Sequence, residues 1–188
     1  SDFIDSHAAH FTFDQGVLEI MVLSAQHEKP NRTLSMLVEV IAEETGIDIE
    51  RFGSTTFKRA DLHKGFEPDS CFYIQNEERV RGKLEIDLQA DPPPDLVIEI
   101  DISHPSLDKL PIYAQVGIPE VWRYTNNALH IFALKDGHYE DSAQSVAFPL
   151  LTNTVIVQFL EESAELRSTA WLRRVRAWVR SQTQDNDH

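Results

Sequence analysis

The chain has 188 residues, 41% of them hydrophobic, and a formal net charge of −14 at pH 7. Its length and apolar content suit one domain with a single core, which we expect to span residues 1–181, with 182–188 as a short disordered tail. The negative charge excludes a broad surface that coats nucleic acid, because an acidic surface repels phosphate unless local cations or a bound metal intervene.

No stretch of the sequence has the character of a targeting or membrane segment. No apolar run approaches the roughly 20 residues that span a bilayer, and the first residues lack a basic region followed by an apolar stretch. Cys71 is the single cysteine, so it has no partner for an internal disulfide. We therefore expect a cytoplasmic protein with no membrane partner.

A hairpin, a helix and two strands are predicted in the first half of the chain. Residues 11–23 are apolar around the turn signal Asp14-Gln15-Gly16, which is typical of two short strands joined by a turn. Between residues 30 and 45 apolar side chains recur at helical spacing, with Pro30 suited to the first turn and Gly46 to the end. Strands are predicted at 51–58 and 69–75, with a polar stretch, 76–82, after the second.

The second half continues as strand, helix, strand. Pro92-Pro93-Pro94 can enter neither a helix nor a central strand, so a boundary precedes the apolar run 96–102, which predicts a buried strand. A helix capped within 103–106 should run to Val116 and end at Gly117. Further strands are predicted at 121–124, 129–134 and 155–160, and Asp136-Gly137 marks a hairpin turn that leads to Tyr139.

The C-terminal segment 167–180 carries arginines and no acidic residue. Trp171, Val175, Trp178 and Val179 fall on one helical face within it. Such a helix could cover the body of the domain or a partner subunit. Packing on the domain is favoured, and homodimerisation through this helix stays open.

Three acidic residues share one face of the predicted strand 96–102. Period-two alternation separates the apolar positions from Asp95, Glu99 and Asp101. A carboxylate within an apolar strand is costly to bury unless it is paired, protonated or bound to a cation, so metal binding would explain Glu99. Exposure on an edge strand, or pairing with arginines, explains it equally well.

Asp69 begins the neighbouring predicted strand, directly after Pro68. Adjacent strands could bring Asp69 and Glu99 to one point, and two carboxylates with a few waters suit Mg²⁺, with Mn²⁺ as the alternative. Such a centre favours phosphodiester hydrolysis, in which a nearby lysine stabilises developing negative charge. Lys109, one or two turns into the following predicted helix, is the candidate.

Three stretches of the sequence carry a family pattern: EPDSCFYI (67–74), PPDLVIEIDISHPSLDKLPIYAQVGIPEVWRY (93–124) and SAQHEKPNRTLSMLVEVIAEETGI (24–47). They resemble the Uma family of restriction-endonuclease-like proteins. The resemblance implies an α/β fold of the PD-(D/E)XK type, a mixed β-sheet flanked by helices, in which Asp69 and Glu99 bind the metal and DNA is the substrate. It also implies that Glu28 resembles the acid that many members of the superfamily direct at the metal from a helix.

One position departs from the superfamily pattern. The residue two beyond Glu99, where a lysine is usual, is Asp101. The resemblance implies that Lys109 then supplies the migrated lysine from the helix, whereas Asp101 is either a further metal ligand or a sign of impaired catalysis.

Other catalytic classes find little support. His7 and His10 have a spacing that some zinc sites use, but no further ligand lies near them in the sequence. Ser103 and His104 adjoin the expected site without the G-x-S-x-G turn of a serine hydrolase, and no glycine-rich nucleotide loop is present. The leading hypothesis is a magnesium-dependent DNA endonuclease, and the alternative is a non-catalytic binding or assembly module that keeps the nuclease fold.

Overall fold

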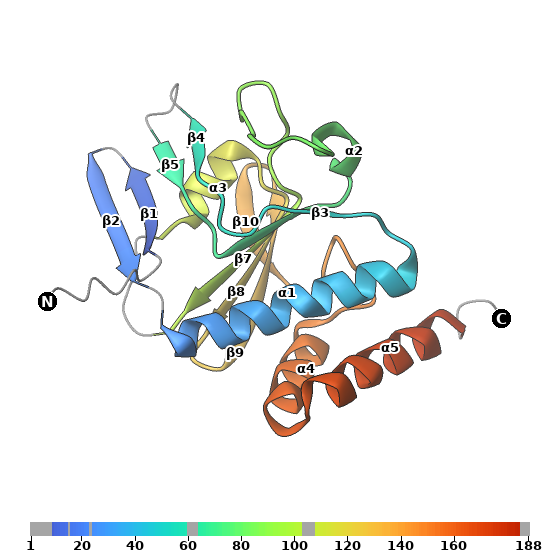
Figure 1. The fold of residues 1–188 in the computed structure, drawn as a ribbon. Helices are drawn as coiled ribbons and strands as arrows, with labels where there is room; N and C mark the ends of the chain where they lie inside the picture. The colour runs from blue at the N-terminus through green and yellow to red at the C-terminus, as the bar shows by residue number, and fades with distance from the viewer. Residues whose placement is uncertain (1–8, 15, 23, 60–63, 103–107, 185–188) are drawn as a thin grey trace, which may run out of the picture.

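The computed structural model describes residues 9–14, 16–22, 24–59, 64–102 and 108–184, and these form two β-sheets and five helices (Figure 1). The larger sheet has the strand order β10-β9-β8-β7-β6-β3, in which β7 and β8 run parallel and every other pair is antiparallel. Its strands are β3 (Glu50–Arg51), β6 (Ser70–Tyr73), β7 (Leu96–Asp101), β8 (Glu120–Thr125), β9 (Ala128–Lys135) and β10 (His138–Ser142). The sheet is therefore mixed.

The smaller sheet is antiparallel, in the order β2-β1-β5-β4. Its strands are β1 (Ala9–Asp14), β2 (Val17–Val22), β4 (Phe57–Arg59) and β5 (Lys64–Phe66). The predicted opening hairpin is confirmed by β1 and β2. The single strand predicted at 51–58 is wrong, because β3 and β4 belong to different sheets and Gly53, with a φ of 54°, turns the chain between them.

Helix α1 (Ala25–Thr45) begins earlier than Pro30, contrary to our prediction. The Ser24 side chain accepts a hydrogen bond from the His27 backbone N–H and caps the helix, so Pro30 lies inside it. The predicted end is confirmed: Gly46 has a φ of 69°, in the left-handed region that glycine adopts without strain. The earlier start matters because it places His27 and Glu28 on α1.

Strand β7 lies between two hydrophobic clusters, which confirms the predicted buried strand. Leu96, Ile98 and Ile100 pack in one cluster with apolar residues of α1 and of the two C-terminal helices. Val97 and Cys71 pack on the opposite face of the sheet, in a second cluster that includes residues of α3 and the smaller sheet. Figure 1 shows α1 crossing the larger sheet, with α3 and the smaller sheet on the other side.

The elements around β7 follow the expected order. A short helix, α2 (Glu77–Val80), occupies part of the polar stretch 76–82. Helix α3 (Leu110–Val116) ends at Gly117 with a φ of 88°, as predicted. The helix expected to be capped within 103–106 begins later, because Lys109 is its N-cap and Leu110 its first residue, so this expected start is wrong. The β9–β10 hairpin turns at Asp136 and Gly137, both at positive φ, as expected for this dipeptide.

The strand predicted at 155–160 is wrong, because these residues lie in helix α4 (Asn153–Glu165). The Thr152 side chain accepts from the Val155 backbone N–H and caps this helix. Ile156 and Phe159, three residues apart, are buried on its inner face. Helical spacing therefore buries the same apolar residues that suggested a strand.

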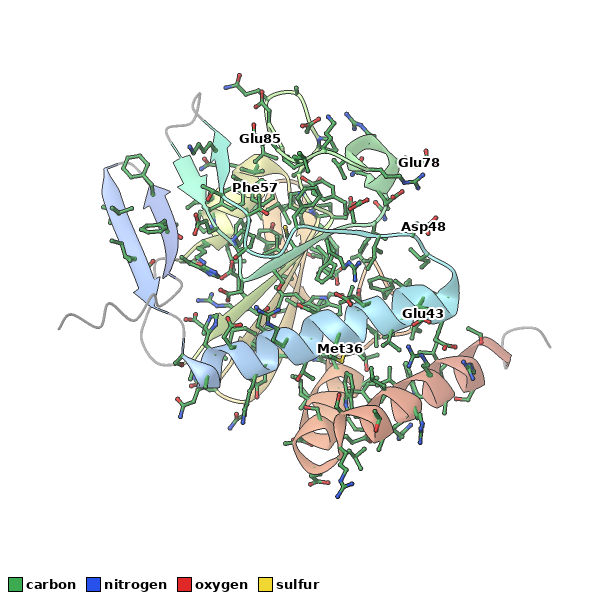
Figure 2. The ribbon with its side chains drawn as sticks, viewed as in Figure 1. Met36, Glu43, Asp48, Phe57, Glu78 and Glu85 are labelled. Atoms are coloured by element: carbon green, nitrogen blue, oxygen red, sulfur yellow. The ribbon has the colours of Figure 1, made fainter. Side chains whose placement is uncertain are left out.

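Helix α5 (Ser168–Gln184) covers the domain, as favoured. Trp171, Val175 and Val179 are buried in the cluster that includes α1 and α4. Two of its arginines pair with α1: Arg176 with Glu43, which Figure 2 shows on the side of α1 that faces α5, and Arg180 with Glu44. The apolar face is thus used within the chain, and the helix continues past the boundary predicted at 181. No helix in the described part of the chain is both long and apolar enough to cross a membrane.

Candidate active site

Asp69, directly before β6, and Glu99, on the neighbouring strand β7, lie opposite each other in the larger sheet. The β6–β7 register pairs Ser70 with Ile98, so the next residues along, Asp69 and Glu99, come opposite one another. Asp69 is only 2% exposed, and its Oδ2 accepts a 2.7 Å hydrogen bond from the Ile100 backbone N–H. The pairing of these strands therefore brings the two acids together, as predicted.

Glu99 is held by two side chains from one end of α3. Lys109 Nζ lies 2.8 Å from Glu99 Oε2, and the Tyr113 hydroxyl donates to Glu99 Oε1. Lys109 also donates to the Glu67 carbonyl at 3.3 Å and is 8% exposed. It occupies the N-cap position of α3 rather than a place one or two turns inside the helix, which corrects our prediction of its position.

The two buried carboxyls have opposite electrostatic environments. Burial raises the pKa of Glu99, the nearby Asp69 charge adds to this, and Lys109 offsets only part of the effect. Burial would also raise the pKa of Asp69, but contacts with His10 and His27 and the positive charge of Lys109 hold it well below its usual range. Asp69 is therefore ionised at neutral pH, beside a carboxyl whose charge the site disfavours.

Two histidines flank the Asp69 carboxylate. His10 Nδ1, from β1, is hydrogen bonded to Asp69 Oδ1 at 2.9 Å. His27 Nε2, from the first turn of α1, lies 3.1 Å from Asp69 Oδ2. Burial lowers the pKa of His27, but the adjoining Asp69 carboxylate more than offsets this, so its pKa is raised. The smaller sheet and α1 thus both contribute to the site.

A polar network fixes the backbone beside Asp69. Asn31 Nδ2 donates to the Asp69 carbonyl at 3.2 Å, and Ser70 Oγ donates to Asn31 Oδ1 at 2.9 Å. Ser35 Oγ in turn donates to Ser70 Oγ at 3.0 Å. These bonds attach α1 to the start of β6, so the position of Asp69 is set by two elements at once.

Glu28 lies at the margin of the site. Its Oε1 is 3.9 Å from His27 Nδ1, and Arg32 Nε donates to its Oε2 at 3.3 Å. The side chain is 34% exposed. Glu28 therefore approaches the histidine rather than Asp69 or Glu99 directly.

Asp101, at the end of β7, and Asp95, directly before it, have different partners. Asp101 Oδ2 accepts hydrogen bonds of 2.7 Å and 3.2 Å from Arg123 on β8. Asp95 accepts from the backbone N–H groups of Ile74 and Asn76, where it fixes the turn after β6. Glu99, by contrast, contacts Lys109 and Tyr113.

A cleft of about 690 Å³ opens beside Asp69. It is lined from the smaller sheet by His10, from α1 by Glu28 and Arg32, and near β3 and β6 by Arg51 and Asp69. Both positive and negative side chains therefore border it, and Asp69 is the buried acid that it reaches.

The side chains suit a divalent cation, although no three His, Cys, Asp or Glu residues in the described ranges form a ready-made metal site. The buried Asp69 and the largely buried Glu99 meet at the strand pair, and His27 is a buried ring with no hydrogen bond to either nitrogen among the described residues. Oxygen and imidazole nitrogen donors of this kind bind divalent metals in proteins.

Sequence reasoning missed two contributors. From the sequence, His10 is a candidate only for a zinc site with His7, and Tyr113 is not assigned to the site. Tyr113 is fully buried and also bonds Glu99, while His10 reaches Asp69 across 59 positions of sequence. The spacing of Lys109 and Tyr113, one helical turn apart, was the available signal for Tyr113. His7, Ser103 and His104 lie outside the described residues.

Comparison with known proteins agrees with this architecture. The family model described as "Uma2: Putative restriction endonuclease" matches residues 2–166. A crystal structure of a putative nuclease belonging to DUF820 from Anabaena variabilis ATCC 29413 matches with a TM-score of 0.55 and 14% sequence identity, over 80% of this chain and 90% of that one. No curated protein matches the chain.

The structural likeness concerns the fold, and it confirms the predicted mixed sheet flanked by helices. The family match extends over most of the sequence and includes Asp69, Glu99 and Lys109. The chain therefore belongs to the Uma2 family.

Proposed function

We propose that this chain is a metal-dependent DNA endonuclease in which Asp69 and Glu99 hold a divalent cation, Mg²⁺ by default. The observation that carries the proposal is the contact of Lys109 Nζ with Glu99 Oε2 at 2.8 Å, beside buried Asp69. Because Asp101 stands where the superfamily usually has lysine, a charge-stabilising lysine has to come from elsewhere, and this contact supplies one.

Asp69 and Lys109 have different roles in the proposed reaction. Asp69, ionised and pinned by the Ile100 backbone N–H, presents a fixed negative charge at the end of the cleft. Lys109 brings a positive charge to the same point, where it stabilises the negative charge that develops on the phosphate in the transition state. When bound, the cation would polarise the phosphate and lower the pKa of a water molecule.

Glu28 and Asp101 have supporting roles in this proposal. Glu28 approaches His27 and stays a candidate for orienting that ring. The Arg123 contact of Asp101 favours a role in positioning β8 against β7 over one as a metal ligand. Homodimerisation stays a prediction, and it would need a surface other than the buried face of α5.

The test is cleavage of supercoiled plasmid and of single-stranded DNA with Mg²⁺ or Mn²⁺ by the wild type and Glu99→Gln. We expect metal-dependent nicking that falls by at least about 100-fold in the variant, the order of magnitude for loss of one electrostatic catalytic group. Glu140→Gln, which removes an exposed carboxylate on β10, is the matched control and should cleave like the wild type.

Thermal unfolding with EDTA separates loss of the site from loss of the fold. Cleavage that is unchanged in Glu99→Gln would contradict the assignment. No cleavage and no stabilisation by metal in the wild type would favour the other class of function, a nuclease-fold module that binds or assembles without catalysis.

A further inference from the structure

We propose that His27 is itself a ligand of the divalent ion, and that the centre therefore prefers a first-row transition ion, such as Mn²⁺, over Mg²⁺. This inference rests on the proposed function and deepens it. It begins from a buried group: the His27 residue is 5% exposed, and among the described residues neither of its ring nitrogens makes a hydrogen bond. Its Nε2 lies close to Asp69 Oδ2 without the geometry of a hydrogen bond, which points to a cation that both atoms bind.

The distance between His27 and Asp69 is that of two neighbouring ligands in one coordination shell. Two adjacent ligands of an octahedral ion, each about 2.1 Å from it, lie about 3 Å apart. His27 Nε2 is 3.1 Å from Asp69 Oδ2, without the geometry of a hydrogen bond. His27 and Asp69 thus supply one edge of such a shell, and Glu99 and water complete it.

Glu28 stands where the outer partner of a metal-binding histidine is usually found. A histidine that binds metal through one nitrogen commonly directs the other at a carboxylate, which fixes the ring. Glu28 Oε1 is 3.9 Å from His27 Nδ1, on the opposite side of the ring from Asp69. In this arrangement Glu28 orients His27 from the Nδ1 side, while Nε2 and Asp69 bind the same metal ion. This explains why a carboxylate lies near each ring nitrogen.

His10 has a different place in the same arrangement. Its Nδ1 is already hydrogen bonded to Asp69 Oδ1 at 2.9 Å, so it positions the carboxylate. The two histidines thus contact opposite oxygens of Asp69 and have separate roles. This contrast provides a control of the same residue type, in the same site.

The donor set determines the metal preference. Mg²⁺ takes oxygen ligands and gives up its hydration reluctantly, whereas imidazole nitrogen binds transition ions more readily. Adding His27 to Asp69 and Glu99 therefore shifts the preference of the centre away from Mg²⁺. Loss of the nitrogen ligand should affect Mn²⁺ more than Mg²⁺.

The experiment is pulsed EPR of Mn²⁺ bound to the full chain, with binding constants for Mn²⁺ and Mg²⁺ from calorimetry. We expect coupling of the Mn²⁺ electron spin to an imidazole nitrogen in the wild type. His27→Gln should lose the coupling and weaken Mn²⁺ binding by about 10- to 100-fold, with a smaller change for Mg²⁺. His10→Gln should keep the coupling, and His130→Gln, at an exposed position on β9, controls for surface binding.

The outcomes separate this inference from the nuclease assignment. Bound Mn²⁺ without nitrogen coupling in the wild type would overturn the role of His27, even if cleavage still depends on Glu99. Nitrogen coupling that depends on His27, in a protein that cleaves no DNA, would support the ligand and overturn the nuclease. Coupling that persists in His27→Gln would also overturn the inference, and binding of neither Mn²⁺ nor Mg²⁺ would overturn both proposals.

Discussion

The spacing of Lys109 and Tyr113 has a direct physical explanation in the site. The two residues are four apart at the start of α3, so they lie on the same side of one helical turn. From there each reaches a different oxygen of Glu99. One helix end therefore fixes both the orientation and the charge environment of this carboxylate.

Removing the Tyr113 hydroxyl should leave the Glu99 carboxylate less firmly oriented without creating a cavity in the core. In Tyr113→Phe the ring still fills its buried space against Phe66, but Glu99 Oε1 loses its donor. We expect metal affinity or cleavage to fall by about 10- to 100-fold, as for other residues that orient a metal-binding group. The measurement is calorimetric metal binding alongside the plasmid assay.

Tyr139→Phe is the matched control for that experiment. Its hydroxyl also donates to one acceptor, but this is the Ile118 carbonyl, at 2.7 Å, rather than a residue of the site. It should leave metal binding unchanged. Equal effects of the two substitutions would mean that Tyr113 acts through general stability instead.

The sequence revealed the acids of this site more readily than their partners. Asp69, Glu99 and Lys109 follow from the acid in an apolar strand and from the family pattern. His10 could not be found this way, because its contact depends on how the smaller sheet docks beside β6, and a single histidine in a strand carries no such information. Contacts that depend on tertiary packing leave little trace in local pattern.

At the scale of elements, α4 shows how a local pattern can mislead. Residues 155–160 read VIVQFL, and their β-branched and aromatic side chains favour a strand. The same run places Ile156 and Phe159 at helical spacing, and the Thr152 cap starts a helix just before it. A short apolar run fits both periods, so the cap and the packing against β9 and α5 decide between them.

The cap itself can be tested. Thr152→Ala removes the acceptor for the Val155 N–H and should lower the free energy of unfolding by about 1 kcal/mol. Urea unfolding measures this change. Thr154→Ala, at an exposed position in the same turn, is the control and should cost less; a larger loss there would argue against the capping role of Thr152.

The pairing of α5 with α1 should depend on pH in a defined direction. The hydrogen bond from Arg180 is the main reason that the pKa of Glu44 is lowered. A carboxyl with a lowered folded pKa stabilises the fold above its unfolded pKa, about 4.3, and this contribution is lost as pH falls through the folded value. Arg180→Ala should therefore lower the urea midpoint at pH 7, by an amount that shrinks below about pH 4.

Arg173→Ala provides the comparison on the same helix. Arg173 is exposed on α5, and its removal should leave the midpoint unchanged at both pH values. The urea midpoints of Arg180→Ala and the wild type could instead differ by the same amount down to pH 3. That result would show that the titration of Glu44 does not cause the difference.

For the whole molecule, the charge distribution limits how DNA can be bound. The net charge is −14, and two arginines of the basic helix α5 are paired with glutamates of α1. The cleft beside Asp69 presents Arg32 and Arg51, each near its own carboxylate. At the cleft, attraction to phosphate therefore comes from these two arginines, which lie among the acidic residues Glu28, Glu39, Glu67 and Asp69.

This arrangement predicts a weak dependence of DNA affinity on salt. Each phosphate that a cation neutralises adds about −0.9 to the slope of log affinity against log salt, so two cleft arginines imply a slope of about −2. Measured by fluorescence anisotropy with Glu99→Gln to prevent cleavage, the slope should become shallower by about 1 in Arg51→Ala and stay the same in Arg173→Ala. A slope steeper than about −5, with no change in Arg51→Ala, would place the DNA on another face. The cleft is the expected path because it joins exposed Arg51, at the protein surface, to buried Asp69.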